Sequence, residues 1–360
     1  MSRLAGLKVL VAGGGAIGSI LALTLAEEGA SVVLADPAGL GDNASGVAAG
    51  MLAPAFEAAL DPLSAGHFEL FMASRDAWPA LAARVGAPER ALVRSGAVWA
   101  GDEASVAEMH ARLRSLGARA ELATPIKAET LAPGLVAPAG TVFTPDDWRL
   151  EPAMMLSALG QAFLRAGGRL IASAVTGLDG ARRTLADGGT IEADTLILAT
   201  GMPPAGVRDG LPEFAALQPV KGQIARFAGA RPRAGVMVRA NGVYVTPSVL
   251  GPVAGATMEA GVGDRTVDPA AIAQLRERAA AWLPELAKAR AEGAAGVRAA
   301  TPDGLPLVGA SSREGLLLAL GARRNGWLLA PLIARMIADR LAGAAEGPWD
   351  RAFAPGRFVA

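Results

Sequence analysis

Three glycines near the N-terminus have the spacing of a turn that binds a dinucleotide. Gly13, Gly15 and Gly18 form the pattern G-x-G-x-x-G. In such a turn the first glycine permits the tight bend, the second lets the backbone approach a pyrophosphate, and the third lets a helix pack closely on a strand. Asp36 follows at the distance where a carboxylate accepts hydrogen bonds from ribose hydroxyls. The motif predicts a bound dinucleotide, and by itself it does not distinguish NAD from FAD.

A strand, a helix and a second strand are predicted around this turn. Apolar spacing predicts strands over Lys8–Ala12 and Ser31–Asp36, with a helix over Ala16–Glu28 between them. The N–H groups of Ala16 and Ile17 would then lie at the helix N-terminus, where free donors and the helix dipole attract phosphate. This βαβ unit is the setting that the glycine motif requires.

Further elements are predicted along the rest of the chain. Helical periodicity covers residues 66–85, 105–116, 152–166, 269–291 and 331–341, and strand patterns cover 190–200 and 220–258. We expect the last of these regions to be antiparallel, because Gly, Pro and Asn punctuate short alternating runs. We therefore expect an α/β (mixed α+β) fold in which a Rossmann-like nucleotide-binding domain is interleaved with an antiparallel-sheet domain.

Composition excludes several classes of function. Lys and Arg together number 34, as do Asp and Glu, so a small-molecule partner is favoured over nucleic acid or a membrane surface. Cysteine is absent, which excludes disulfides, thiolate metal sites and a flavin linked through sulfur. Only His67 and His110 are available, so we expect no metal centre and no serine triad. Glycines interrupt the uncharged stretch from Val9 to Ala26, and a soluble cytoplasmic protein is therefore expected.

Three further segments resemble the D-amino-acid oxidase superfamily of flavoproteins. Residues 43–54, NASGVAAGMLAP, resemble the sequence that lies against the flavin in that superfamily. Residues 193–201, ADTLILATG, are similar to a strand and turn near FAD, although alone they would be an ordinary buried strand. Residues 296–309, GVRAATPDGLPLVG, and 321–331, GARRNGWLLAP, resemble the flavin and substrate segments of glycine oxidases, which supply dehydroglycine for the thiazole ring of thiamin.

The resemblance extends over nearly the whole chain and implies a non-covalently bound FAD. It implies an FAD-binding domain of residues 1–82, 141–214 and 300–360 and a substrate-binding domain of residues 83–140 and 215–299. The residues implied to contact FAD are Gly13, Gly15, Ala16, Ile17, Gly18, Asp36, Ala44, Ser45, Ala49, Gly50, Met51, Val175, Ala199, Thr200, Gly201, Arg298, Arg324, Asn325, Gly326, Trp327 and Leu328.

The resemblance also implies five residues of a catalytic pocket, three of which are among the residues implied to contact FAD. Arg298 matches the arginine that pairs with the substrate carboxylate, and Tyr244, the one tyrosine of the chain, matches a tyrosine that reaches the same group. A guanidinium fork suits two parallel hydrogen bonds to a carboxylate. Met51 and Met258 match pocket methionines, and Arg324 matches an arginine near the ring. As an alternative, each methionine would simply fill the core.

The sequence departs from the glycine oxidase pattern at some informative positions. Ala322 and Arg323 stand where the family commonly has His-Phe, which leaves open whether Arg323 or Arg324 faces the ligand. Ser248 stands where an arginine is common, and Asp36 replaces the usual glutamate. These changes bear on the substrate more than on FAD.

The expected activity is flavin-dependent oxidative deamination of a small, glycine-like amino acid or amine. Its products would be an imine and then a keto acid, ammonia and hydrogen peroxide, with molecular oxygen or another electron acceptor as partner. A D-amino-acid dehydrogenase or a sarcosine or secondary-amine oxidase of the same superfamily is the first alternative. An NAD-dependent dehydrogenase and a non-catalytic FAD-binding subunit are further ones. Related oxidases often form oligomers, so a homo-oligomer is compatible with the resemblance, and the sequence leaves the oligomeric state open.

Overall fold

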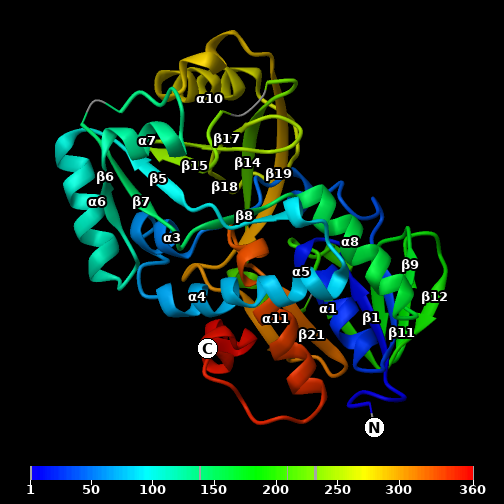
Figure 1. Cartoon of the computed structure of the whole chain (residues 1–360). Coiled ribbons are helices and arrows are strands. Elements are labelled where there is room, and N and C mark those ends of the chain that lie inside the picture. The colour runs from blue at the N-terminus through cyan, green and yellow to red at the C-terminus, as the bar shows by residue number, and fades with distance from the viewer. Residues whose placement is uncertain (1, 138, 209, 231–232, 360) are drawn as a thin grey trace.

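Two β-sheets carry most of the chain, and each is assembled from segments that are far apart in the sequence (Figure 1). The computed structural model describes residues 2–137, 139–208, 210–230 and 233–359. In Figure 1 the larger sheet and helix α10 (Pro269–Trp282) lie above the smaller sheet, which carries both termini of the chain on its side of the molecule. The chain passes between the two sheets several times, as the interleaved prediction requires.

The smaller sheet is Rossmann-like, with parallel pairing between all neighbours except β20 and β21. Its order is β20 (Leu307–Ala310), β21 (Leu316–Leu320), β13 (Thr195–Leu198), β1 (Lys8–Ala12), β2 (Ser31–Ala35) and β9 (Arg169–Ile171). The central strands are runs of Val, Leu, Ile and Ala that are buried on both faces, which is typical of parallel sheets covered on both sides.

Helices cover one face of this sheet and a small antiparallel sheet covers the other. One face packs against α1 (Ala16–Glu27), α8 (Pro152–Arg165) and α11 (Gly326–Leu341), with α4 (Phe68–Asp76) and α5 (Trp78–Val85) outside them. The other face packs against the sheet of β10 (Val175–Asp179), β11 (Arg182–Leu185) and β12 (Thr190–Glu192). The sheet therefore forms the middle of three layers.

The larger sheet is antiparallel except where β15 pairs with β5 in parallel. Its order is β18 (Glu259–Ala260), β14 (Gln218–Phe227), β17 (Val253–Gly255), β16 (Val243–Thr246), β15 (Met237–Ala240), β5 (Ala97–Ala100), β7 (Thr141–Thr144) and β6 (Glu121–Ala123), with β19 (Ala291–Ala300) paired to β14. Ten residue pairs join β14 to β19 without a break, so their register fixes which side chains enter the site.

The remaining elements connect and cover the two sheets. A third small sheet joins β3 (Met51–Leu52), β8 (Trp148–Leu150) and β4 (Leu92–Val93). The other helices are α2 (Ala44–Val47), α3 (Pro54–Leu60), α6 (Glu103–Ser115), α7 (Pro125–Leu131), α9 (Ala205–Arg208) and α12 (Asp350–Phe353), with 3-10 turns at 89–91, 212–216, 284–288 and 355–358.

The structure confirms the predicted βαβ opening to within one residue at each end and corrects three later boundaries. The helix predicted over 269–291 ends at Trp282, because Pro284 follows and its ring excludes a continuing helix. The helix predicted over 66–85 is two helices that meet at Ala77. The helix predicted from Pro331 begins at Gly326, so that proline lies within the helix.

The division into domains stays a prediction, and one of its boundaries disagrees with the strand pairing. The segment 141–214, assigned to the FAD-binding domain, begins with β7, which pairs with β5 and β6 in the larger sheet. Hydrogen bonding therefore places 141–144 with the larger sheet, and the boundary on this criterion lies after Thr144.

We expect Gly18→Ala to destabilise the protein at the turn between β1 and α1. A Cβ at Gly18 would lie 1.8 Å from the carbonyl oxygen of Gly13, which is rigid backbone. The free energy of unfolding should fall by at least about 2 kcal/mol, measured by urea denaturation. Gly66→Ala is the matched control, because its added Cβ meets nothing within 4 Å. Equal stabilities of the two variants would contradict the packing argument.

Candidate active site

The glycine turn borders a cavity of about 150 Å³ at the carboxyl ends of β1 and β2. Its lining joins the turn to the segments after β13 and before α11, and comprises Gly13, Gly15, Ala16, Ile17, Asp36, Asn43, Ala44, Ser45, Ala199, Thr200, Gly201, Val297, Arg298, Ala299, Ala319, Leu320, Gly321, Ala322, Arg323 and Gly326. A Cβ at Gly13 would lie 2.5 Å from the oxygen of Ala199, and Gly13 has φ +106°. Only glycine fits this turn.

The start of α1 fits the phosphates of a dinucleotide. No acidic residue occurs in the first turn of α1, and its N-cap residue Gly15 has no side chain to occupy the free N–H groups. The N–H of Ala16 donates to the Ser45 hydroxyl at 2.9 Å. Asp36 lines the same cavity, where its carboxylate accepts from the N–H of Gly14 at 2.6 Å. The helix start offers donors to an anion, and Asp36 is held where a ribose would lie.

A second cavity of about 400 Å³ adjoins the first, and Ala44 and Arg298 line both. The short helix α2 lies at their junction. Its N-cap, Asn43, accepts from the N–H groups of Ser45 and Gly46 at 3.0 and 3.1 Å. The indole N–H of Trp327 donates to the Ser45 carbonyl at 3.0 Å, which ties α2 to the start of α11. The two cavities are therefore parts of one site.

Arg298 enters the second cavity across a glycine of the neighbouring strand. On β19 it pairs with Val220, and its guanidinium lies over Gly222, where an added Cβ would come within 2.0 Å of Nη1. Among the described residues it has no carboxylate partner, and Nη1 lies 3.5 Å from the Met258 sulfur. Burial lowers the pKa of Arg298, and a half-buried cation of this kind calls for an anion.

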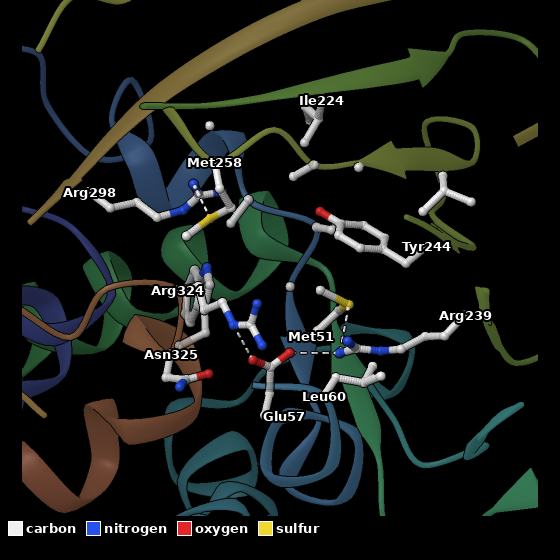
Figure 2. A pocket seen from close by; sticks show the side chains of 18 of the residues that line it. Met51, Glu57, Leu60, Ile224, Arg239, Tyr244, Met258, Arg298, Arg324 and Asn325 are labelled. Atoms are coloured by element: carbon white, nitrogen blue, oxygen red, sulfur yellow. Dashed lines mark hydrogen bonds and ion pairs between the residues drawn. The ribbon is translucent and has the colours of Figure 1, made fainter. Parts of the chain in front are cut away.

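Tyr244 enters the same cavity in a similar way. It pairs with Gly255 across β16 and β17, and a Cβ at Gly255 would lie 2.2 Å from the phenol oxygen. Burial raises the pKa of Tyr244, although Arg298 and Arg239 oppose the change. The hydroxyl therefore stays protonated at neutral pH and is a hydrogen-bond donor that faces the cavity together with Arg298 (Figure 2).

A buried carboxylate, Glu57, lies across the cavity from this pair (Figure 2). Arg239 donates from Nη2 to its Oε1 at 2.8 Å, and Nε of Arg324 lies 2.5 Å from its Oε2, an ion pair without good hydrogen-bond alignment. Burial opposes the ionisation of Glu57, but the two guanidinium groups outweigh it and hold its pKa below the ordinary value. Glu57 is therefore a carboxylate at neutral pH.

The structure separates the two arginines between which the sequence could not choose. Arg324 lines the larger cavity, whereas Arg323 lines the nucleotide cavity and forms an ion pair with Asp61. Arg323 has a left-handed backbone with φ +49°, so consecutive side chains diverge. Nη2 of Arg324 lies 3.5 Å from Asp61 as well. Arg324 is thus the one that faces the space beside Met51 and Tyr244.

Helix α3 presents Glu57, and a second buried acid anchors that helix. The Asp147 carboxylate accepts from the N–H groups of Ala55 and Phe56 at 2.8 and 3.2 Å, at the start of α3. Burial raises the pKa of Asp147 to about 7, although Arg239 and these two N–H groups oppose the rise. The two buried acids, one on α3 and the other in the loop between β7 and β8, therefore titrate in opposite directions, because only Glu57 contacts guanidinium groups.

Most residues that the sequence singled out line the two cavities, and all five expected in the catalytic pocket line the larger one. Three do not line either cavity. Gly18 lies beneath the turn, Val175 is buried under the sheet, and Leu328 is buried in the helical core. The roles of all these residues stay predictions.

Four charged residues in or beside the site were not predicted from the sequence: Glu57, Asp61, Arg239 and Asp147. Glu57 and Asp61 follow Pro54 and lie four residues apart, a spacing that puts two acids on one helix face. This spacing could have indicated a paired acidic group on a helix. Nothing local pointed to Arg239, which is 182 residues from Glu57. In the described ranges, no cluster of three or more His, Asp or Glu could hold a metal ion, and no helix is both long and apolar enough to span a membrane.

The chain is similar to known flavoproteins over most of its length. A family model described as FAD dependent oxidoreductase matches residues 8–340. The glycine oxidase of Geobacillus kaustophilus (strain HTA426) is 31% identical over 84% of this chain and 83% of its own. A crystal structure of glycine oxidase from Geobacillus kaustophilus has a TM-score of 0.86 and 29% identity, with 98% of this chain and 99% of that one covered.

A second kind of relative is longer than this chain. The tRNA 5-methylaminomethyl-2-thiouridine biosynthesis bifunctional protein of Maricaulis maris (strain MCS10) is 32% identical over 98% of this chain, but only 55% of its own length is covered. This chain therefore matches about half of that protein.

We expect Asp147→Asn to remove a component of the pH dependence of stability. The folded state holds the Asp147 proton more tightly than the unfolded chain, because its pKa is about 7 and that of an exposed Asp is about 4. The stabilisation by protonated Asp147 is complete below about pH 4 and is lost as the pH rises toward 7. Relative to the Asn variant, the wild type should lose up to about 1.4 kcal/mol per pH unit in this window.

The measurement is urea denaturation of both proteins across this pH window. Asparagine is the matched replacement, because it keeps an acceptor oxygen for the start of α3 and does not titrate. Parallel curves of stability against pH would show that Asp147 titrates alike in the folded and unfolded states.

Proposed function

The chain belongs to the FAD dependent oxidoreductase family, and on that basis we propose that it oxidises a small, glycine-like amino acid or amine bearing a carboxylate. The product would be an imine, which water hydrolyses to a keto acid and ammonia. One observation carries the proposal: Arg298, a cation without an acid partner among the described residues, shares the larger cavity with Tyr244. Membership in this family contradicts the NAD-dependent alternative.

The residues of the nucleotide cleft would hold the cofactor. The turn at Gly13 and Gly15 and the start of α1 would bind the pyrophosphate, and Asp36 would bind the ribose. The segment from Ala49 to Met51 and the start of α11 near Trp327 line the larger cavity, where the ring would lie. When bound, FAD supplies the chemistry that the side chains lack, since it accepts the equivalent of a hydride from the substrate α-carbon.

The side chains of the larger cavity would bind and orient the substrate. The guanidinium of Arg298 would donate two hydrogen bonds to the carboxylate, and the protonated Tyr244 would donate a third. Fixing one end of a small molecule in this way orients its α-carbon toward the ring. Met51 and Met258, which line the same cavity, would limit the size of the substrate side chain.

The charges of the cavity favour the neutral amine, which is the form that can be oxidised. Arg239, Arg298 and Arg324 line it, and Glu57 is the one acid among the lining residues. Nearby positive charge lowers the pKa of an ammonium group. Glu57 already contacts two guanidinium groups, so we assign it no role as a base.

The choice among related substrates rests on measurement. Glycine is favoured by two curated relatives named glycine oxidase, at 31% and 30% identity. An anaerobic absorbance scan of the FAD-loaded protein with glycine, sarcosine, D-alanine and D-proline would identify the substrate by bleaching of the flavin band. Peroxide release under air would then separate an oxidase from a dehydrogenase. A flavin that none of these amines bleaches would contradict the proposal.

Arg298→Ala should raise the KM for the best amine substrate by about 100-fold or more, because it deletes a charge-assisted pair worth about 2–3 kcal/mol. Arg298→Lys should recover only part of this loss, since an ammonium group cannot make the paired hydrogen bonds. Steady-state kinetics of both variants, each loaded with FAD, provide the test. An unchanged KM in Arg298→Ala would refute the proposal that Arg298 binds the substrate carboxylate.

Gly222→Ala should also weaken substrate binding by Arg298, but without removing a charge. The added Cβ would meet the guanidinium within 2.0 Å and displace it from its position over the strand. We expect a rise in KM of about tenfold, with little change in the FAD content measured by absorbance. Gly263→Ala is the control, because its Cβ would make only ordinary contacts, 3.8 Å from Pro219. If KM stays at the wild-type value in Gly222→Ala, Arg298 does not depend on that glycine.

A further inference from the structure

Arg239 is a second arginine of the cavity wall, and only part of its hydrogen-bonding capacity is used. It lies on β15 opposite Tyr244 of β16, and it is 6% exposed. Its Nη2 donates to Glu57 at 2.8 Å and lies 3.5 Å from the Met51 sulfur, whereas its buried Nε–H has no partner among the described residues. A guanidinium has five N–H donors, and burying any of them without an acceptor is costly.

The acid beside Arg239 does not balance the positive charge of the wall. Glu57 divides one negative charge between Arg239 and Arg324, because each of its oxygens faces a different guanidinium. The second acid nearby, Asp61, pairs with Arg323 and lies 3.5 Å from Arg324. The lining of the larger cavity therefore holds three arginines against one glutamate, an excess of two positive charges.

We propose that Arg239 forms a second anion-binding position, so that the site takes amines with two acid groups. The class would be N-carboxyalkyl amino acids and amino dicarboxylic acids. One carboxylate would pair with Arg298 and the other with the free donors of Arg239. The inference rests on the proposed function for the role of Arg298, and it adds a substrate class to it.

The arrangement of the two arginines supports a ligand that reaches both. In Figure 2 the Arg298 guanidinium lies beside Met258, and that of Arg239 lies between Met51 and Glu57, on the other side of the cavity. The positive charges of both guanidinium groups lower the pKa of the Tyr244 hydroxyl, and so oppose the increase that burial causes. A small molecule anchored at Arg298 and Tyr244 would thus direct a second acid group toward Arg239.

Two stable ethers test this inference without turnover. Diglycolate and methoxyacetate have an ether oxygen in place of the amine nitrogen of iminodiacetate and sarcosine, and they differ from each other by one carboxylate. Their dissociation constants would be measured by titration calorimetry on the FAD-loaded wild-type protein at fixed ionic strength. We expect diglycolate to bind at least about tenfold more tightly. Equal or weaker binding of diglycolate would overturn the inference, whatever the variants do.

Variants then locate the preference. Arg239→Gln should raise the diglycolate dissociation constant about tenfold or more and change that of methoxyacetate by less than about threefold. Arg298→Ala should weaken both. A folded Arg239→Gln protein that still prefers diglycolate would place the second anion elsewhere and refute the role of Arg239. Arg239→Lys keeps the charge and should retain part of the preference.

The outcome is separable from that of the proposed function. Bleaching by glycine or sarcosine with no preference for diglycolate would leave the amine oxidase proposal standing and remove the second position. A preference for diglycolate that Arg239→Gln abolishes, in a protein whose flavin no amine bleaches, would leave the anion position standing and remove the oxidase.

Discussion

The site depends on two large polar side chains that enter one cavity where the neighbouring strand has no side chain. The Arg298 guanidinium occupies the space above Gly222, and the Tyr244 ring occupies the space above Gly255. Because β14 pairs with both β17 and β19, the register of one strand fixes both positions. A shift of one residue would turn each side chain to the opposite face of the sheet. The half-buried cation at the centre of the proposed function is therefore a product of sheet register.

The contact between the two sheets places the Arg298 cation next to the nucleotide cleft, since Arg298 lines both cavities. The cleft for the nucleotide is built at the ends of the parallel strands, and the larger cavity is built on the antiparallel sheet. Ala44 of α2 lines both cavities, and Gly296 of β19 packs closely against it because glycine has no Cβ; an added Cβ would lie 3.1 Å from the Ala44 Cα. Small residues at this junction would let the nucleotide and the proposed carboxylate-bearing substrate lie next to each other. Each sheet alone would hold half of the site.

Local signals predicted what local interactions build. The βαβ opening follows from glycine spacing and apolar runs within the first 36 residues, and the structure reproduces it. The helix predicted over 269–291 is too long, because its apolar periodicity continues beyond Pro284, whereas the helix itself ends at Trp282. The group of Glu57, Arg239 and Arg324 could not be predicted, because its members come from three distant segments and meet only when both sheets are folded. The resemblance supplied Arg298 and Tyr244, whereas sheet geometry explains why they converge.

The opposite behaviour of two buried acids, Glu57 on α3 and Asp147, which contacts the start of that helix, shows how the charge of the site is set. Asp147 is buried against backbone N–H groups, so burial prevails and its pKa rises to about 7. Glu57 is also buried, but two guanidinium groups contact it and its pKa falls. At neutral pH the wall of the cavity thus keeps one fixed negative charge among three positive ones. An ammonium group would increase this excess, whereas a neutral amine joined to a carboxylate reduces it. In the proposed function, these electrostatics would favour a substrate that bears an acid group and whose amine is neutral, the form that can be oxidised.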